Sequence, residues 1–189
     1  MSLGSSPNRM RGLLVAGFLC VLVSAPVTAM ETLDFSVTGP GADLLKDLRG
    51  ASGLVAAEKQ KQTDAQDIFS KARAEYAALV SALYARGYYS GVVHVWIDGR
   101  EAASIPPLDA PTSIRRIQVT VDTGPVFAFS KAEVTPLAPR TELPPGFAIG
   151  KTAESDVITQ AVIAGVDGWR GKGHAKAKTA SQSIVADHA

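Results

Sequence analysis

The sequence predicts an α+β protein made of two copies of one β-α-α-β-β unit, in which two helices pack on a three-stranded mixed sheet. Short runs alternate between apolar and polar residues, which is typical of half-buried strands. Longer runs repeat apolar residues every three or four positions, as amphipathic helices do. Aligning Gly87 with Gly173 superimposes the two halves at a period of about 86 residues, which is the length of a domain rather than of a solenoid repeat. The second copy is expected to be incomplete at its C-terminal strand.

The first 29 residues predict a secretory signal peptide. Arg9 and Arg11 precede an apolar run over residues 12–25, and "VTA" at 27–29 places small residues before the expected cleavage site. The run is shorter than the roughly 20 residues that span a bilayer, so a retained anchor is the weaker alternative. The single cysteine, Cys20, lies in this segment, and the mature chain is therefore expected to carry neither a disulfide nor a reactive thiol.

The first copy, expected over residues 30–125, begins with a strand and a short helix. "LDFSVTGPG" alternates from Leu33 and ends at a glycine-proline turn. "ADLLKDLRGASGL" places leucines at helical spacing, with Gly50 or Gly53 as its C-cap. The polar stretch "AAEKQKQTDAQ" that follows is expected to be an exposed link.

A longer helix follows the link, capped at its N-terminus by Thr63 or Asp64. One apolar stripe runs down it to Gly87, and "GYYSG" ends it. Tyr88 and Tyr89 are expected to cover the turn into the next strand. The stripe consists of Ile68, Phe69, Ala72, Tyr76, Leu79, Val80, Leu83 and Tyr84.

Two strands complete the first copy. "VVHVWIDG" places Val93, Val95 and Ile97 on the core side and ends in an Asp98-Gly99 turn. After a polar loop from residue 100 to 113, "IRRIQVTVDTGP" alternates in the same way up to Gly124-Pro125, which joins the copies with little linker.

The second copy, expected over residues 126–189, repeats the cycle only in part. "VFAFSKAEVTP" predicts a strand, and the run from Lys151 predicts a helix capped by Thr152 or Ser155 with Trp169 in its core. A glycine break at Gly173 and a further strand-like run follow.

The repeated unit resembles the polypeptide-transport-associated (POTRA) domain. The resemblance is carried by "LYARGYY" at the helix end, by the hairpin, and by "VTVDTGP" running directly into "VFAFSKAEV". The tandem is most similar to the periplasmic N-terminal region of the TamA family, within the superfamily that includes BamA and the two-partner secretion transporters. A POTRA region of a BamA-like protein or a two-partner secretion transporter is the closest alternative.

The resemblance implies a location at the periplasmic face of a bacterial outer membrane. It implies unfolded outer-membrane proteins as clients, a TamB-like partner that spans the periplasm, and attachment through a C-terminal β-barrel. This sequence lacks the barrel and further domains, which predicts an N-terminal fragment of a longer protein. A free-standing periplasmic chaperone is the alternative if the natural chain ends at Ala189.

The stretch "PPGFAIGKTAESD" is the one candidate for a phosphate site. A phosphate-binding loop needs four residues between its first glycine and Gly-Lys-Thr, and here Gly146 and Gly150 enclose three. Glu154 and Asp156 would repel a phosphate at the helix that follows. The residues therefore predict no enzyme, cofactor or metal site. A periplasmic phosphate- or nucleotide-binding enzyme at Gly150-Lys151-Thr152 is kept as the alternative from a different class.

Binding is predicted instead at a sheet edge. The strand after the long helix is expected to be an edge that accepts an extended peptide, with Val92, His94, Trp96 and Asp98 as its candidate residues. Gly87, Tyr88, Gly124, Pro125, Trp169 and Gly173 are expected to be structural. The formal net charge of +1 does not favour nucleic acid. A local basic cluster of Arg170, Lys172, Lys176 and Lys178 is expected to be a solvated face, with contact to lipid headgroups or to acidic partners as the alternative.

Overall fold

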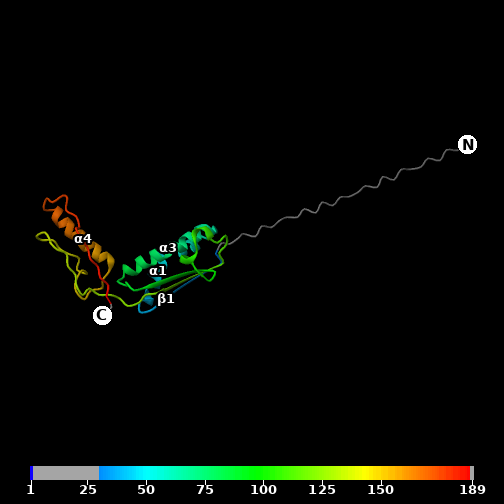
Figure 1. The fold of residues 1–189 in the computed structure, drawn as a ribbon, viewed down its shortest axis with the longest axis horizontal. Helices are drawn as coiled ribbons and strands as arrows, with labels where there is room; N and C mark the ends of the chain where they lie inside the picture. Colours follow the sequence, from blue (N-terminus) through cyan, green and yellow to red (C-terminus); the bar gives the residue numbers. More distant parts are fainter. Residues whose placement is uncertain (2–29, 188–189) are drawn as a thin grey trace.

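The computed structural model describes Met1 and residues 30–187, and the predicted signal peptide therefore lies outside the described residues apart from Met1. The described part is a mixed α+β structure with four α-helices and a four-stranded sheet. Two lobes follow one another along the chain, a larger one that holds the sheet and a smaller one around α4 (Ser155–Arg170) (Figure 1). None of the described helices combines the length and apolar character that crossing a bilayer requires.

The sheet has the strand order β1-β4-β2-β3. β1 (Thr32–Thr38) and β4 (Arg116–Asp122) are parallel, whereas β2 (Val92–Ile97) is antiparallel to β4 and to β3 (Arg100–Glu101). A fourth strand, β3, thus joins the three expected ones, and it lies where the sequence predicts a loop. The Asp98-Gly99 turn creates it, because both residues adopt positive φ (46° and 83°) and so close a tight hairpin that pairs Ile97 with Arg100.

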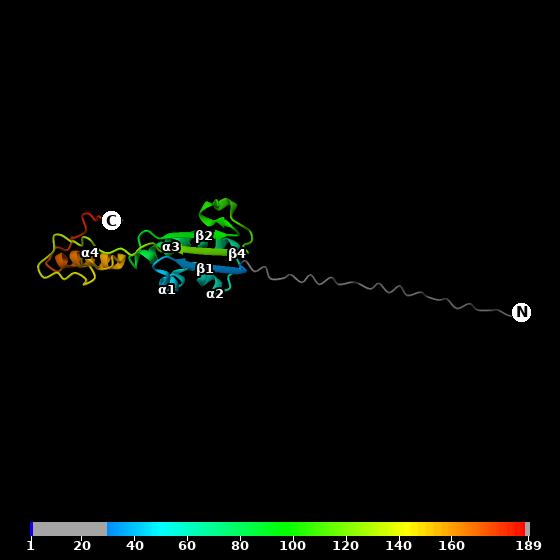
Figure 2. The same ribbon diagram turned by 90° about the horizontal axis from the view of Figure 1, so that it is seen from below.

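The helices α1 (Leu45–Ala51), α2 (Gly53–Lys59) and α3 (Ala65–Tyr84) cover one face of the sheet (Figure 2). The predicted exposed link is wrong over α2, and neither Gly50 nor Gly53 caps α1. The Ser52 hydroxyl accepts a hydrogen bond from the Val55 amide at 3.0 Å and begins a new helix, which buries Leu54, Val55 and Ala57. Of the two expected N-caps of α3, Thr63 and Asp64, it is Asp64 that caps the helix, accepting from the Asp67 amide at 2.8 Å.

The core lies between these helices and the sheet. From the sheet it takes alternate residues of β4 and β2, and Val95, Ile97, Ile117, Val119 and Val121 are all 2 % exposed or less. From the helices it takes Leu48, Leu54, Ile68, Ala72, Leu79 and Leu83, each no more than 1 % exposed. The alternation read from the sequence therefore fixes which face of each strand is buried.

Residues 126–187 contain α4 but no sheet strand. The predicted strand over "VFAFSKAEVTP" is represented only by an isolated bridge between Ala128 and Thr152, and no strand forms after Gly173 within the described residues. Trp169 was expected in the core but is only partly buried, with its indole N–H donating to the Pro136 carbonyl at 2.9 Å. A loop rather than a sheet packs on this part of α4, so the core that would bury Trp169 is absent here.

The two lobes are held together at the corner that ends α3. Gly87 has φ +80°, and its carbonyl accepts from the Phe127 amide at 2.8 Å. The Tyr89 hydroxyl donates to the Ala153 carbonyl at 2.6 Å, and its ring meets Phe127 edge-on with centroids 5.8 Å apart. A β-carbon at Gly87 would lie 2.7 Å from Thr152 Cγ2, so this corner has no room for a side chain.

Candidate functional site

Three of the four predicted edge residues share the sheet face that the helices leave uncovered. Val92 is 50 % exposed, and the rings of His94 and Trp96 stack with centroids 5.9 Å apart. Asp98 has a different position: its carboxylate accepts from the Arg115 and Arg116 amides at distances from 2.9 to 3.3 Å. Asp98 thereby ties the hairpin to the start of β4.

The backbone of β2 presents alternate residues to its outer edge. The N–H and C=O of Val95 point outward, because they bond Glu101 and Tyr76 rather than β4. Neighbouring residues in a strand point their polar groups to opposite sides, so the backbones of His94 and Trp96 face β4. The outward set is Val93, Val95 and Ile97, and β3 already pairs with Ile97.

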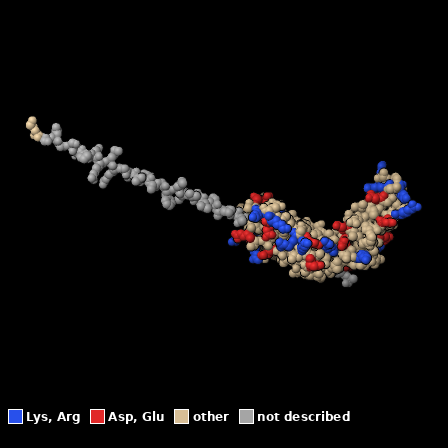
Figure 3. All heavy atoms as spheres, turned by 180° about the vertical axis from the view of Figure 1, so that it is seen from behind, with Lys and Arg blue, Asp and Glu red and all other residues tan. Residues whose placement is uncertain are grey.

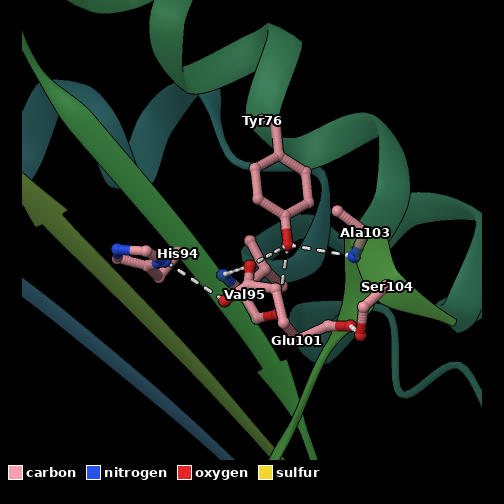
Figure 4. Close-up of polar contacts among 6 residues, drawn as sticks. All are labelled: Tyr76, His94, Val95, Glu101, Ala103 and Ser104. Atoms are coloured by element: carbon pink, nitrogen blue, oxygen red, sulfur yellow. Dashed lines mark hydrogen bonds and ion pairs between the residues drawn. The ribbon is translucent and has the colours of Figure 1, made fainter.

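A side-chain network closes the edge at Val95 (Figure 4). Glu101 Oε1 accepts from the Val95 amide at 3.1 Å and from the Tyr76 hydroxyl, which also contacts the Val95 carbonyl at 3.2 Å. The second oxygen, Oε2, lies 3.1 Å from His94 Nδ1. Glu101 and Tyr76 thus occupy the place that the backbone of an added strand would take, and only Val93 keeps free outward groups on this edge within the described residues.

The electrostatics of the network favour a charged carboxylate beside a neutral phenol. Burial, followed by the hydrogen bond to Glu101, raises the pKa of Tyr76 to about 12. Partial burial alone would raise the pKa of Glu101, but the hydrogen bonds from Tyr76 and the Val95 amide, together with His94, bring it below its ordinary value. Glu101 is therefore an ionised acceptor at neutral pH, and a charged acceptor makes the stronger hydrogen bond.

Replacing Glu101 with alanine is expected to expose the Val95 amide. One hydrogen bond of about 1 kcal/mol is lost, so the Val95 amide proton should exchange with solvent about fivefold faster than in the parent chain. NMR hydrogen exchange measures this rate. Ser104→Ala is the control, because the Ser104 hydroxyl bonds only the Glu101 backbone carbonyl at 2.7 Å. Equal protection of Val95 in all three proteins would contradict the closed edge.

The opposite edge of the sheet, β1, is open. Its even-numbered residues face β4, as shown by the Thr32 amide donating to Arg115 at 3.2 Å and the Thr38 carbonyl accepting from Thr123 at 3.1 Å. The outward set is therefore Leu33, Phe35 and Val37. No hydrogen bond from another part of the described chain reaches their N–H and C=O groups.

Two of the three backbone donors of the Gly150-Lys151-Thr152 segment are used within the chain. The Gly150 amide donates to Phe129 at 2.8 Å and the Lys151 amide to Ala148 at 3.1 Å. The next residues continue the pattern, since Ala153 donates to Phe127 at 2.9 Å and Glu154 to Thr152 at 2.9 Å. A phosphate cradle requires several N–H groups that converge on open space, and these donors do not provide them.

The basic cluster lies at the far end of α4. Arg170 pairs with Asp167 at 3.5 Å, while Lys172, Lys176 and Lys178 are exposed. An open hollow of about 610 Å³ adjoins it, lined by Trp169, Gly173, His174 and residues 175–177. On the face of the larger lobe that Figure 3 shows, charges of both signs are interspersed.

The fold and the site define a mixed α+β module with one closed and one open sheet edge. No protein-family model matches the chain, and no curated protein sequence matches it. Nor do the described residues gather three or more His, Cys, Asp or Glu side chains that could hold a metal ion.

Proposed function

We propose that this chain is a POTRA-type binding module, which holds extended polypeptide segments by adding them as strands to an edge of its sheet. The observation that carries the proposal is the seven-residue β1 edge, whose outward backbone groups have no partner in the described chain. Main-chain pairing of this kind depends little on side chains, which suits a module that handles many unfolded clients. Because Glu101 and Tyr76 close the β2 edge at Val95, the proposal places this pairing at β1 rather than at the predicted β2 edge.

The wider role follows from the resemblance to the TamA family. In that role the module is the periplasmic arm of an outer-membrane assembly factor and presents clients, or a TamB-like partner, to a barrel elsewhere in the full protein. Support comes from the mixed sheet with helices on one face and from the corner at Gly87, where the two lobes share hydrogen bonds. A short and bonded junction fixes the spacing of the lobes, which an arm requires. No catalytic step enters this mechanism.

The first test measures whether the chain binds extended peptides at all. Fluorescein-labelled peptides with alternating valine and threonine are titrated with the full chain, and fluorescence anisotropy is expected to rise to saturation. The matched control is the same peptide with every second residue replaced by proline, which removes backbone donors and should abolish binding. If the alternating peptide does not bind, the proposed function is wrong.

Lys151→Ala separates the proposal from a phosphate-site enzyme. We expect the variant to bind the peptide as the parent chain does and to differ by less than about 0.5 kcal/mol in the free energy of unfolding, as surface substitutions usually do. A loss of phosphate or nucleotide binding in this variant, measured by calorimetry, would favour the enzyme instead.

A further inference from the structure

The apolar row of β1 is less buried than the row beside it. Leu33, Phe35 and Val37 are half-buried, although they pair with the β4 residues Ile117, Val119 and Val121, which are at most 1 % exposed. The difference arises because β4 has neighbours on both sides and β1 has one. A strand added outside β1 would complete the burial of this row and supply partners for its outward N–H and C=O groups.

One cation lies at the centre of this edge. The Arg49 guanidinium carbon is 5.6 Å from the centroid of the Phe35 ring, on the face of the sheet that α1 covers. Arg49 forms no ion pair within residues 30–187. On the other face of the sheet, by contrast, Asp34 is already paired with Arg116 at 2.7 Å. At the middle of the β1 edge, the unpaired charge is therefore that of Arg49, on the face of the sheet that the helices cover.

The charge of Arg49 distinguishes between two possible occupants of the β1 edge, a second copy of this chain and a different polypeptide. A second copy of the chain would match β1 in register, because antiparallel pairing about Phe35 places Leu33 opposite Val37. The same two-fold axis would bring the two Arg49 side chains towards each other across Phe35, and like charges in that position oppose the pairing. An acidic side chain opposite Phe35 meets Arg49 favourably, which favours a different polypeptide as the occupant.

We propose that β1 binds an extended segment of another polypeptide in which an acidic residue stands between two apolar ones, each separated from it by one residue. The segment becomes a new outermost strand, its acidic side chain pairs with Arg49, and its apolar side chains cover Leu33 and Val37. This inference rests on the proposed function and specifies the edge and the sequence pattern that the module selects.

The probe is the heptapeptide Thr-Val-Thr-Glu-Thr-Val-Thr, which reads the same in both directions and therefore fits either strand orientation. The full ¹⁵N-labelled chain is titrated with it, and we expect the amide signals of Leu33, Phe35 and Val37 to shift most. N-methylation of the Val and Glu residues removes the donors on one side of the peptide, and N-methylation of the Thr residues removes those on the other. One of the two modified peptides should lose binding, since only one side faces β1.

Charge reversal tests the acidic pattern. Arg49→Glu is expected to weaken binding of the heptapeptide with the central Glu roughly tenfold, because repulsion replaces attraction. The same variant should bind a heptapeptide with Lys in place of that Glu more tightly than the parent chain does. Arg100→Glu is the matched control, since it makes the same change at an exposed position on the opposite edge. It should leave both affinities unchanged.

The outcomes separate this inference from the proposed function. Shifts centred on Val93 would overturn the choice of β1 while leaving a peptide-binding module. Binding that maps to β1 but is unaffected by Arg49→Glu would overturn the acidic pattern, and dimerisation through β1 without peptide would overturn the choice of occupant. If the chain binds no alternating peptide at all, the proposed function itself is wrong.

Discussion

Replacing Glu75 with alanine is expected to lower the free energy of unfolding by about 3 kcal/mol. Glu75 is 1 % exposed on α3, and one carboxylate oxygen accepts from the Gly53 amide at 3.0 Å and the Leu54 amide at 3.2 Å. These are the first amides of α2, which no preceding turn of that helix can satisfy. Alanine would leave the part-buried Gly53 amide and the buried Leu54 amide without this partner and open a cavity between the two helices.

Urea unfolding monitored by circular dichroism measures this loss. Glu58→Ala is the matched control, because Glu58 is exposed on α2 and its removal should cost less than about 0.5 kcal/mol. A Glu75→Ala protein as stable as this control would show that α2 does not depend on the carboxylate.

The ionisation of Glu75 adds a pH dependence with a definite sign. Burial raises the pKa of Glu75 above its ordinary value, against the opposing hydrogen bonds from Ser52, Leu54 and Gly53. The folded state then holds a proton that the unfolded state releases, so the contribution of Glu75 to stability falls as pH rises from the unfolded towards the folded pKa. Glu75→Gln keeps the shape of the side chain but does not titrate. As pH rises across that interval, the free energy of unfolding of the parent should therefore fall relative to that of the variant. A constant difference from pH 4 to 7 would contradict the raised pKa.

Leu79→Ala is expected to cost about 3 kcal/mol, within the range of roughly 2 to 5 kcal/mol typical of buried leucine. Leu79 is fully buried on α3 among the core residues that face the sheet. Leu108→Ala makes the identical change at a position that is 99 % exposed, and it should leave the urea midpoint unchanged. Similar losses in the two variants would mean that α3 does not pack on the sheet as described.

Periodicity predicts most of the elements in the first 122 residues, with α2 and β3 as the exceptions. Alternation predicts the three long strands and three-to-four spacing predicts the long helix, because one buried face imposes each pattern. The residue types at Thr63 and Asp64 predict the cap of that helix. The helix α2 was missed because its sequence is polar on one side, and Gly53 suggested an end rather than a beginning. Ser52 was the available signal, since serine is a preferred N-cap residue.

The polar side chains that shape the site were harder to predict. Glu75 interrupts an apolar stripe, and nothing local shows that its partners are on a different helix. Glu101 could have been placed by counting, because a two-residue turn at Asp98-Gly99 sets Glu101 opposite Trp96. Its reach to the Val95 amide and Tyr76 depends on side-chain conformation, which spacing does not encode. The strand expected over "VFAFSKAEVTP" is wrong because a strand requires a continuous ladder with a neighbouring strand, and the described chain offers only one isolated bridge here, between Ala128 and Thr152.

The order of the strands also determines when the sheet can assemble. β4 is the last of the four in the sequence, yet it lies between β1 and β2 and supplies the ladder to both. As the chain emerges during synthesis, β1 therefore has to wait for residues about 84 positions later, and long-range pairing of this kind slows folding. Until Arg116–Asp122 have been made, neither β1 nor β2 has the central strand with which it pairs.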